Sequence, residues 1–262
     1  MTSTLLAGRA ALVTGSSRGI GRATALALAD HGADVVVHCR QARELAEETA
    51  AAVRARGRRA WVMSADLEDP AQIFALFAGV REQVGGLDIY VANAAATAFK
   101  PTLAMRPHHF ERTFNLIVRS LMLAVQEAVP LMKGRPGRII TVSGHGTRFT
   151  LAHYAALGSA KGAVETWTRY LAYELGSLGI TANCISPGVI DTDSARYYLK
   201  DTFDRLDQAV ARDTPLGRMG VPDDVAGAAV WLASDLAQFV TGQVIQVDGG
   251  LSLASGPFEE IR

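Results

Sequence analysis

The sequence has little of what marks secreted, membrane-spanning or nucleic-acid-binding proteins. Its 262 residues include only two cysteines, Cys39 and Cys184, too few for a disulfide framework; both lie in apolar, strand-like runs that predict buried thiols. The 26 Lys and Arg residues balance the 26 Asp and Glu residues, so net charge does not favour nucleic acid. No secretory signal pattern is evident, and no run approaches the ~18 apolar residues of a membrane span. We therefore predict a cytoplasmic protein that binds neither nucleic acid nor membrane.

No internal repeat, low-complexity tract or linker divides the chain. Short, continuously apolar runs alternate with longer helical patterns, which is typical of a parallel sheet buried on both faces. The expected strands are 11–14 with its flank, 34–39, 59–65, 87–93, 138–143, 180–186 and 243–249. The expected helices are 19–31, 43–56, 70–84, about 106–133, about 154–177 and 222–234. The alternation predicts a single α/β domain over residues 1–262, a doubly wound parallel sheet with helices on both faces.

One long segment, residues 187–220, shows no periodicity. Loops of this length in compact domains tend to be functional. We predict that it forms a substrate lid with short helices. Within it, Tyr197 and Tyr198 are candidates for substrate contact rather than for catalysis.

The segment TGSSRGIG, residues 14–21, joins the first expected strand to the first expected helix. In this context Gly15 permits a tight turn, Gly19 lets the backbone approach a phosphate, and Gly21 allows close helix packing. The helix N-terminus then offers free N–H groups and a positive dipole end to a pyrophosphate. The predicted dinucleotide contacts are Gly15, Ser17, Arg18, Gly19, Ile20 and Gly21.

The second expected strand ends without an acidic residue. NAD sites usually have Asp or Glu there to bind the ribose 2′-hydroxyl, but this chain has His38, Cys39 and Arg40. Arg18 and Arg40 could instead pair with a 2′-phosphate, which suits the geometry of a guanidinium. These residues favour NADPH as the cofactor.

Further motifs follow in order: VANAAA, Asn115, GSAKGA, NCISPGVIDT and VDGG. With them the chain resembles the short-chain dehydrogenase/reductase family nearly end to end. The resemblance implies a Rossmann-like domain, a nicotinamide cofactor and usually a homotetramer. It also implies that Asn115 positions a water linked to Lys161. The further cofactor contacts it implies are Asp66 and Leu67 near the adenine, Asn93 on the ribose side, and Pro187, Gly188, Ile190 and Thr192 at the nicotinamide end.

Two positions depart from the family's usual pattern, which is Tyr-x3-Lys with a serine upstream. Counted back from Lys161, the tyrosine position holds Leu157 and the serine position holds Gly144. Ser143 is adjacent, but neighbouring side chains of a strand point to opposite faces. A carbonyl-reducing site without either hydroxyl should be very weak.

Tyr154 lies seven positions before Lys161. Seven residues of an α-helix return a side chain to within ~20° of its starting direction, so the two can share one face. Compared with the usual spacing, the tyrosine starts ~4.5 Å farther along the helix axis. This shift suits a substrate whose oxygen lies farther from the carbon that receives hydride.

An enoyl thioester is such a substrate, because hydride goes to the β-carbon while negative charge builds on the thioester oxygen. The Tyr-x6-Lys spacing resembles that of NADPH-dependent type III enoyl-acyl-carrier-protein reductases, which usually keep the serine replaced here by Gly144. We expect Tyr154 to donate a hydrogen bond to the enolate oxygen and Lys161 to bind the nicotinamide ribose. Thioesters of acyl carrier protein and of coenzyme A both fit, in fatty acid or polyketide metabolism.

Three alternatives remain open from the sequence. The protein could be a ketoreductase of 3-oxoacyl or polyketide type with a displaced tyrosine, a reductase of another activated alkene, or a catalytically degenerate NADP-binding protein. Intact Lys161 and Asn115 argue against the last.

Other polar residues carry less weight. His145 and His153 flank the expected site, and His108 and His109 open a helix; loop or solvent positions explain all four. No residues show metal-ligand spacing. Ser143 lacks the preceding glycine of a hydrolase nucleophile elbow.

Overall fold

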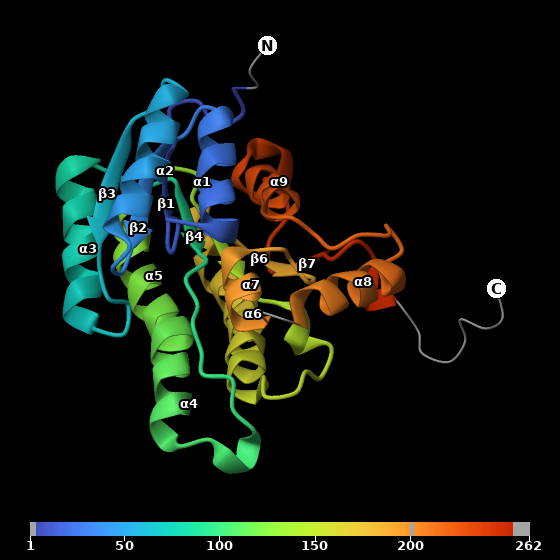
Figure 1. The fold of residues 1–262 in the computed structure, drawn as a ribbon. Helices are drawn as coiled ribbons and strands as arrows, with labels where there is room; N and C mark the ends of the chain where they lie inside the picture. The colour runs from blue at the N-terminus through green and yellow to red at the C-terminus, as the bar shows by residue number, and fades with distance from the viewer. Residues whose placement is uncertain (1–3, 200–201, 254–262) are drawn as a thin grey trace.

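A seven-stranded, all-parallel sheet forms the centre of the molecule (Figure 1). The computed structural model describes residues 4–199 and 202–253, except for the side chains of Tyr198 and Leu199. The strand order is β3-β2-β1-β4-β5-β6-β7, which confirms the predicted Rossmann-like fold. The direction of winding reverses between β1 and β4, and ligands bind in such folds at the strand ends beside this reversal. The strands are β1 (Ala10–Val13), β2 (Asp34–Cys39), β3 (Ala60–Ser64), β4 (Ile89–Ala92), β5 (Arg138–Val142), β6 (Thr181–Pro187) and β7 (Val244–Val247).

Helices cover both faces of the sheet, and each layer has its own hydrophobic core. Val35 and Val37 belong to one core and Val36 to the other. Because alternate side chains enter different cores, the strand is apolar throughout. One layer comprises α1 (Gly19–Asp30), α2 (Arg43–Ala55) and α9 (Pro222–Ala233). The other comprises α3 (Pro70–Gln83), α4 (Pro107–Phe114), α5 (Ser120–Leu131) and α6 (Ala155–Leu175).

The helix expected over 106–133 contains an irregularity that its sequence does not predict. A π-helical turn, Asn115–Arg119, joins α4 to α5. By length and composition the stretch Pro107–Leu131 could cross a membrane, with 44% of its most apolar window buried in the protein. It packs against α3 and α6. A core helix passes the same test, so this stretch gives little support for a membrane span.

The predicted short helices of the 187–220 segment are present as α7 (Asp193–Leu199) and α8 (Phe203–Asp213). Phe203, Val210 and Met219 form a small buried cluster within this segment, and Leu251 packs against it. The side chain of Tyr198 lies outside the described part of the chain, and Tyr197 is exposed. Both cysteines are buried free thiols, as predicted.

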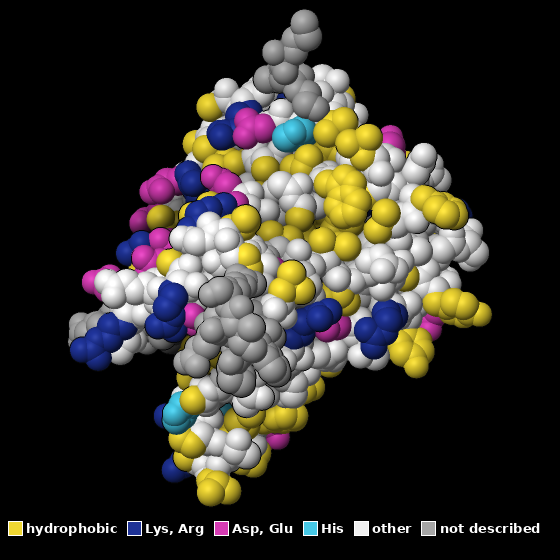
Figure 2. Space-filling model, turned by 90° about the vertical axis from the view of Figure 1, so that its right-hand side faces the viewer, with side chains coloured by type: hydrophobic (Ala, Val, Ile, Leu, Met, Phe, Trp, Pro, Cys, Tyr) yellow, Lys and Arg dark blue, Asp and Glu magenta, His cyan; other side chains and the backbone are white. Residues whose placement is uncertain are grey.

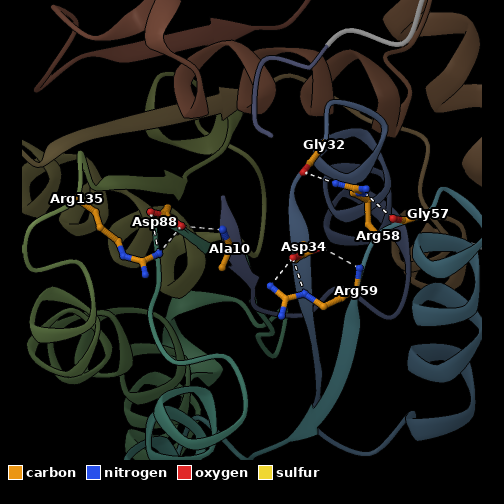
Figure 3. A network of polar contacts seen from close by, with 8 residues as sticks. All are labelled: Ala10, Gly32, Asp34, Gly57, Arg58, Arg59, Asp88 and Arg135. Carbon is orange, nitrogen blue, oxygen red and sulfur yellow. Dashed lines mark hydrogen bonds and ion pairs between the residues drawn. The ribbon is translucent and has the colours of Figure 1, made fainter. Parts of the chain in front are cut away.

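Charged groups tie the amino ends of the strands together (Figure 3). The Asp88 carboxylate accepts a 2.8 Å hydrogen bond from the Ala10 N–H and lies 3.2 Å from the Arg135 guanidinium. Asp34 accepts two 2.8 Å bonds from Arg59, one from its backbone and one from its side chain. These ion pairs occupy the edge of the sheet opposite the carboxyl ends, where ligands bind in this fold.

Candidate active site

A groove of about 440 Å³ runs along the carboxyl ends of the central strands. Thr192 lies against the glycine-rich loop, because a Cβ at Gly19 would be 3.7 Å from the Thr192 methyl carbon. Of the predicted cofactor contacts, Asp66, Lys161, Pro187, Gly188 and Ile190 are not in its lining. Those that line it are Gly15, Ser17, Arg18, Gly19, Ile20, Gly21, Arg40, Leu67, Asn93 and Thr192.

The glycine-rich loop has the geometry of a phosphate cradle. Gly15 and Gly19 adopt positive φ angles of 65° and 56°, a region that glycine enters without strain. At Gly21, a Cβ would lie 2.3 Å from the Gly15 carbonyl oxygen, so only glycine fits. Helix α1 starts with no side-chain cap and no acidic residue in its first turn. Its free N–H groups and positive dipole end therefore suit an anion.

The side chains of Asn93 and His38 hold the glycine-rich loop in place through hydrogen bonds to its backbone. The Asn93 amide donates a 2.9 Å hydrogen bond to the Thr14 carbonyl. His38 Nδ1 accepts a 3.1 Å bond from the Gly15 N–H, which leaves Nε2 to donate to the Ala65 carbonyl at 3.1 Å. Burial lowers the pKa of His38 to about 4. Sequence reasoning missed this role for His38, although an imidazole within the apolar run DVVVHC was a usable signal.

Acidification should therefore destabilise the protein through His38. The native pKa of about 4 lies below the ordinary value of 6.5. Between pH 6.5 and pH 4, His38 is protonated in the unfolded chain but not in the native protein. The free energy of unfolding therefore decreases as the pH falls through this range, by ~3 kcal/mol in total. Protonated Nδ1 could no longer accept from Gly15. We expect urea unfolding at pH 7 and pH 5 to show a smaller pH dependence in His38→Gln; an equal dependence in both proteins would contradict this assignment.

Positive charge gathers near the end of β2. Arg40 lies 3.5 Å from the Glu68 carboxylate, and Arg112 binds the same carboxylate at 3.1 Å. One carboxylate thus serves two guanidiniums. Arg18, the exposed residue of the glycine-rich loop, adds a further charge to the groove.

Lys161 is buried within α6 and is 6% exposed. Its ammonium donates a 2.5 Å hydrogen bond to the Val142 carbonyl at the end of β5. Burial lowers its pKa to about 8. A void of about 10 Å³ beside it, also lined by Ser120 and Tyr90, is roughly the size of one water molecule.

Asn115 lies in the π-helical turn, and its carbonyl accepts a hydrogen bond from the Ser120 N–H. Such turns are frequent at functional sites. The direct bond of Lys161 goes to Val142, so the predicted water-mediated link between Asn115 and the lysine stays a prediction.

Tyr154 stands at the start of α6, where its carbonyl accepts the first helical hydrogen bond from Gly158. His153, just before it, adopts a left-handed φ of 63° that turns the chain into the helix. The Tyr154 ring lies 5.7 Å from that of Phe99 between centroids. Burial raises the pKa of the Tyr154 phenol, so it is a protonated donor at neutral pH.

Three glycines surround the Tyr154 ring. A Cβ at Gly146 would come within 2.5 Å of the ring, and one at Gly158 would lie 3.5 Å from it. A Cβ at Gly144 would lie 3.9 Å from the Tyr154 hydroxyl. The residue positions 144, 146 and 158 thus form a glycine socket for the tyrosine.

The structure shows what occupies the two positions, 144 and 157, at which the family usually carries hydroxyls. Gly144 has an extended backbone with φ of 171°, so serine could stand there, within hydrogen-bonding reach of Tyr154. Leu157 is 9% exposed and belongs to the hydrophobic core. Ser143 cannot replace the missing serine, because its hydroxyl donates a 2.8 Å bond to Glu165. The phenol near Gly144 therefore belongs to Tyr154, three residues before the position where the family usually has its tyrosine.

The histidines near the site contact other rings. His145 stacks on Phe149 with centroids 4.4 Å apart, and burial lowers its pKa. His108 and His109 lie against each other at the start of α4. Within residues 4–199 and 202–253, no group of three His, Cys, Asp or Glu side chains could hold a metal ion.

Comparisons with known proteins identify the family. A family model described as enoyl-(acyl carrier protein) reductase matches residues 15–252. The 1-cyclohexenylcarbonyl-CoA reductase of Streptomyces collinus is 39% identical over 247 residues, which cover 94% of this chain and 88% of the relative. Versicolorin reductase 1 of Aspergillus parasiticus is 36% identical over 253 residues, covering 94% and 97%. The structure of the angucycline C-6 ketoreductase LanV with bound NADP has a TM-score of 0.88 at 35% identity, covering 96% of this chain and 98% of that one. The chain is thus a reductase that belongs to the short-chain dehydrogenase/reductase family.

Proposed function

We propose that the protein is an NADPH-dependent reductase of an activated carbon–carbon double bond, with an enoyl thioester as its substrate. One observation carries the proposal: the Tyr154 hydroxyl lies beside Gly144, while the usual tyrosine position is filled by the core residue Leu157. The acidic group of the site therefore starts three residues before the usual position, immediately in front of α6. This position suits an oxygen two carbons away from the carbon that is reduced.

The groove fits a phosphorylated dinucleotide. The glycine-rich loop and the uncapped start of α1 suit the pyrophosphate, and Arg18 and Arg40 suit a 2′-phosphate. When bound, NADPH supplies the hydride that reduces the β-carbon. Lys161 would bind the ribose hydroxyls at the nicotinamide end, with Asn115, Pro187, Gly188 and Thr192 supporting that end as in the family.

Tyr154 would stabilise the negative charge that develops on the thioester oxygen. Its burial keeps the phenol protonated, so it donates a hydrogen bond to the enolate. The α-carbon then takes its proton from Tyr154 or from water. Lys161, with a pKa of about 8, is mostly protonated at neutral pH, and its charge lowers the cost of a partly ionised phenol.

The relatives support both this reading and one alternative. The Streptomyces collinus protein is a reductase of a CoA thioester that carries a cyclohexenyl group, and the family model is that of enoyl reductases. LanV, in contrast, is a ketoreductase. Ketone reduction is therefore the second candidate, although Gly144 and Leu157 remove the two hydroxyls usual for it.

A paired assay distinguishes the candidates. Purified protein and NADPH would be given crotonyl-CoA or 1-cyclohexenylcarbonyl-CoA and, separately, acetoacetyl-CoA. We expect NADPH consumption with the enoyl thioesters. Consumption with acetoacetyl-CoA alone would establish the ketoreductase instead, and tight NADPH binding without any turnover would indicate a degenerate binding protein.

Arg40→Glu tests the cofactor assignment. An acid at this position should repel the 2′-phosphate and accept the ribose 2′-hydroxyl, so NADPH affinity should fall about tenfold or more while NADH affinity improves. Fluorescence titration of each cofactor measures both effects. Arg43→Glu, on the exposed start of α2, is the control for added negative charge. Equal changes for both cofactors would refute the 2′-phosphate contact.

The larger organisation stays a proposal as well. We expect one catalytic domain over residues 1–262, with α7 and α8 in a substrate lid, in a cytoplasmic homotetramer. Figure 2 shows apolar side chains scattered over the face that it presents. Phe239 and Leu236, between α9 and β7, are fully or largely exposed in the single chain, and assembly would cover such groups. Light scattering of the purified protein tests the tetramer.

A further inference from the structure

We propose that Glu165 is a positioning residue that fixes the active-site loop, residues 143–147, and through it the hydroxyl of Tyr154. The inference rests on the proposed role of Tyr154. Glu165 lies on α6, one turn beyond Lys161, and is only partly exposed.

The Glu165 carboxylate holds both ends of this loop. One of its oxygens accepts 2.8 Å hydrogen bonds from the Ser143 hydroxyl and from the Thr147 hydroxyl. Ser143 follows β5 directly, and Thr147 ends the single turn after it. Hydrogen bonds to a charged acceptor are stronger than those between neutral groups, so this carboxylate closes the loop onto α6.

The clamped loop forms part of the glycine socket. Gly144 lies next to the Tyr154 hydroxyl, and Gly146 lies so close to the ring that a Cβ there would be 2.5 Å from a ring carbon. The Gly146 carbonyl also lies near Gly158 of α6, within 3.1 Å of where a Cβ would be. The loop is thus packed between the ring and the helix. Its position determines where the phenol hydroxyl points.

The hydrogen bond to Glu165 also explains the role of the Ser143 hydroxyl. With Gly144 in place of the usual serine, the adjacent Ser143 is committed to Glu165 rather than to substrate. The loop that usually contributes a hydroxyl to the reaction contributes here to the placement of Tyr154. Loss of the carboxylate should therefore lower kcat and leave cofactor binding intact, since the groove lining does not include Glu165.

A double-mutant cycle tests the proposal on whichever thioester the enzyme reduces. We expect Glu165→Ala to lower kcat about ten- to a hundredfold, because a reacting group displaced by about 1 Å costs this much, with NADPH affinity unchanged. In the Tyr154→Phe background the same change should have almost no further effect. Glu165→Gln, which keeps an acceptor oxygen, should restore most of the activity. Glu174→Ala, an exposed acid on the same helix, is the control.

Multiplicative losses in the double variant would overturn the proposal, as would a Glu165→Gln enzyme as slow as Glu165→Ala. Crystal structures of wild type and Glu165→Ala with NADP⁺ give a readout that needs no turnover. We expect the 143–147 loop and the Tyr154 ring to move together in the variant, and an unmoved ring would refute the clamp. If Tyr154→Phe proves fully active, the proposed catalytic role of Tyr154 fails, while the crystal structures still decide whether Glu165 places the ring.

Discussion

Replacing Tyr154 with phenylalanine should lower kcat by about 10²–10³-fold, the usual cost of removing one donor from an oxyanion site. The Tyr154 hydroxyl is the group nearest to where a side chain at position 144 would begin, 3.9 Å from a Cβ placed there. Without it the negative charge on the thioester oxygen loses its hydrogen bond in the transition state. NADPH affinity should stay nearly unchanged, because the ring does not line the cofactor groove.

Stopped-flow single-turnover rates with saturating NADPH measure this effect without interference from product release. Tyr170→Phe, which removes an exposed phenol from the same helix, is the matched control and should behave as wild type. A Tyr154→Phe enzyme within about threefold of wild type would show that the ring serves packing only, and the donor to the enolate would then have to be sought elsewhere.

The layered fold could be predicted from the sequence because its signals are local. The run DVVVHC is apolar at consecutive positions, and in the structure its side chains do enter two different cores. Helix ends at Gly32 and Gly57 were readable for the same reason, since both glycines adopt the positive φ that ends a helix. The π-helical turn at Asn115 had no such signal, because the apolar pattern continues through it.

The site was predictable only in part. The order of motifs predicted that the glycine-rich loop and Thr192 line one groove, which the structure shows. Tyr154 lies immediately before α6 rather than within it, so the predicted shared helix face with Lys161 stays a prediction. The partners of Ser143 and His38 could not be predicted, because both depend on contacts between segments distant in the sequence. Gly146 illustrates the same limit: only the structure shows that it makes room for the ring of Tyr154, eight residues later in the chain.

Gly146→Ala should impair catalysis strongly, although less than loss of the phenol itself. The added methyl carbon would lie 2.5 and 2.6 Å from two ring carbons of Tyr154, far inside van der Waals contact. Phe99 also packs against this ring, with centroids 5.7 Å apart, so the ring or the loop must move. We expect kcat to fall about ten- to a hundredfold, with NADPH affinity unchanged and the loss bounded by that of Tyr154→Phe.

Gly162→Ala provides the control, because a Cβ at that position of α6 meets nothing within 4 Å. That variant should keep full activity and gain up to ~1 kcal/mol in helix stability. Comparing the two variants thus separates the loss of activity caused by a methyl group in the glycine socket from the general effect of replacing glycine with alanine. A fully active Gly146→Ala enzyme would mean that the ring has a second productive position, and the tight socket would then not be what places the hydroxyl. A variant that loses NADPH affinity as well as turnover would instead locate the damage in the groove, since displacement of Tyr154 alone predicts a loss confined to kcat.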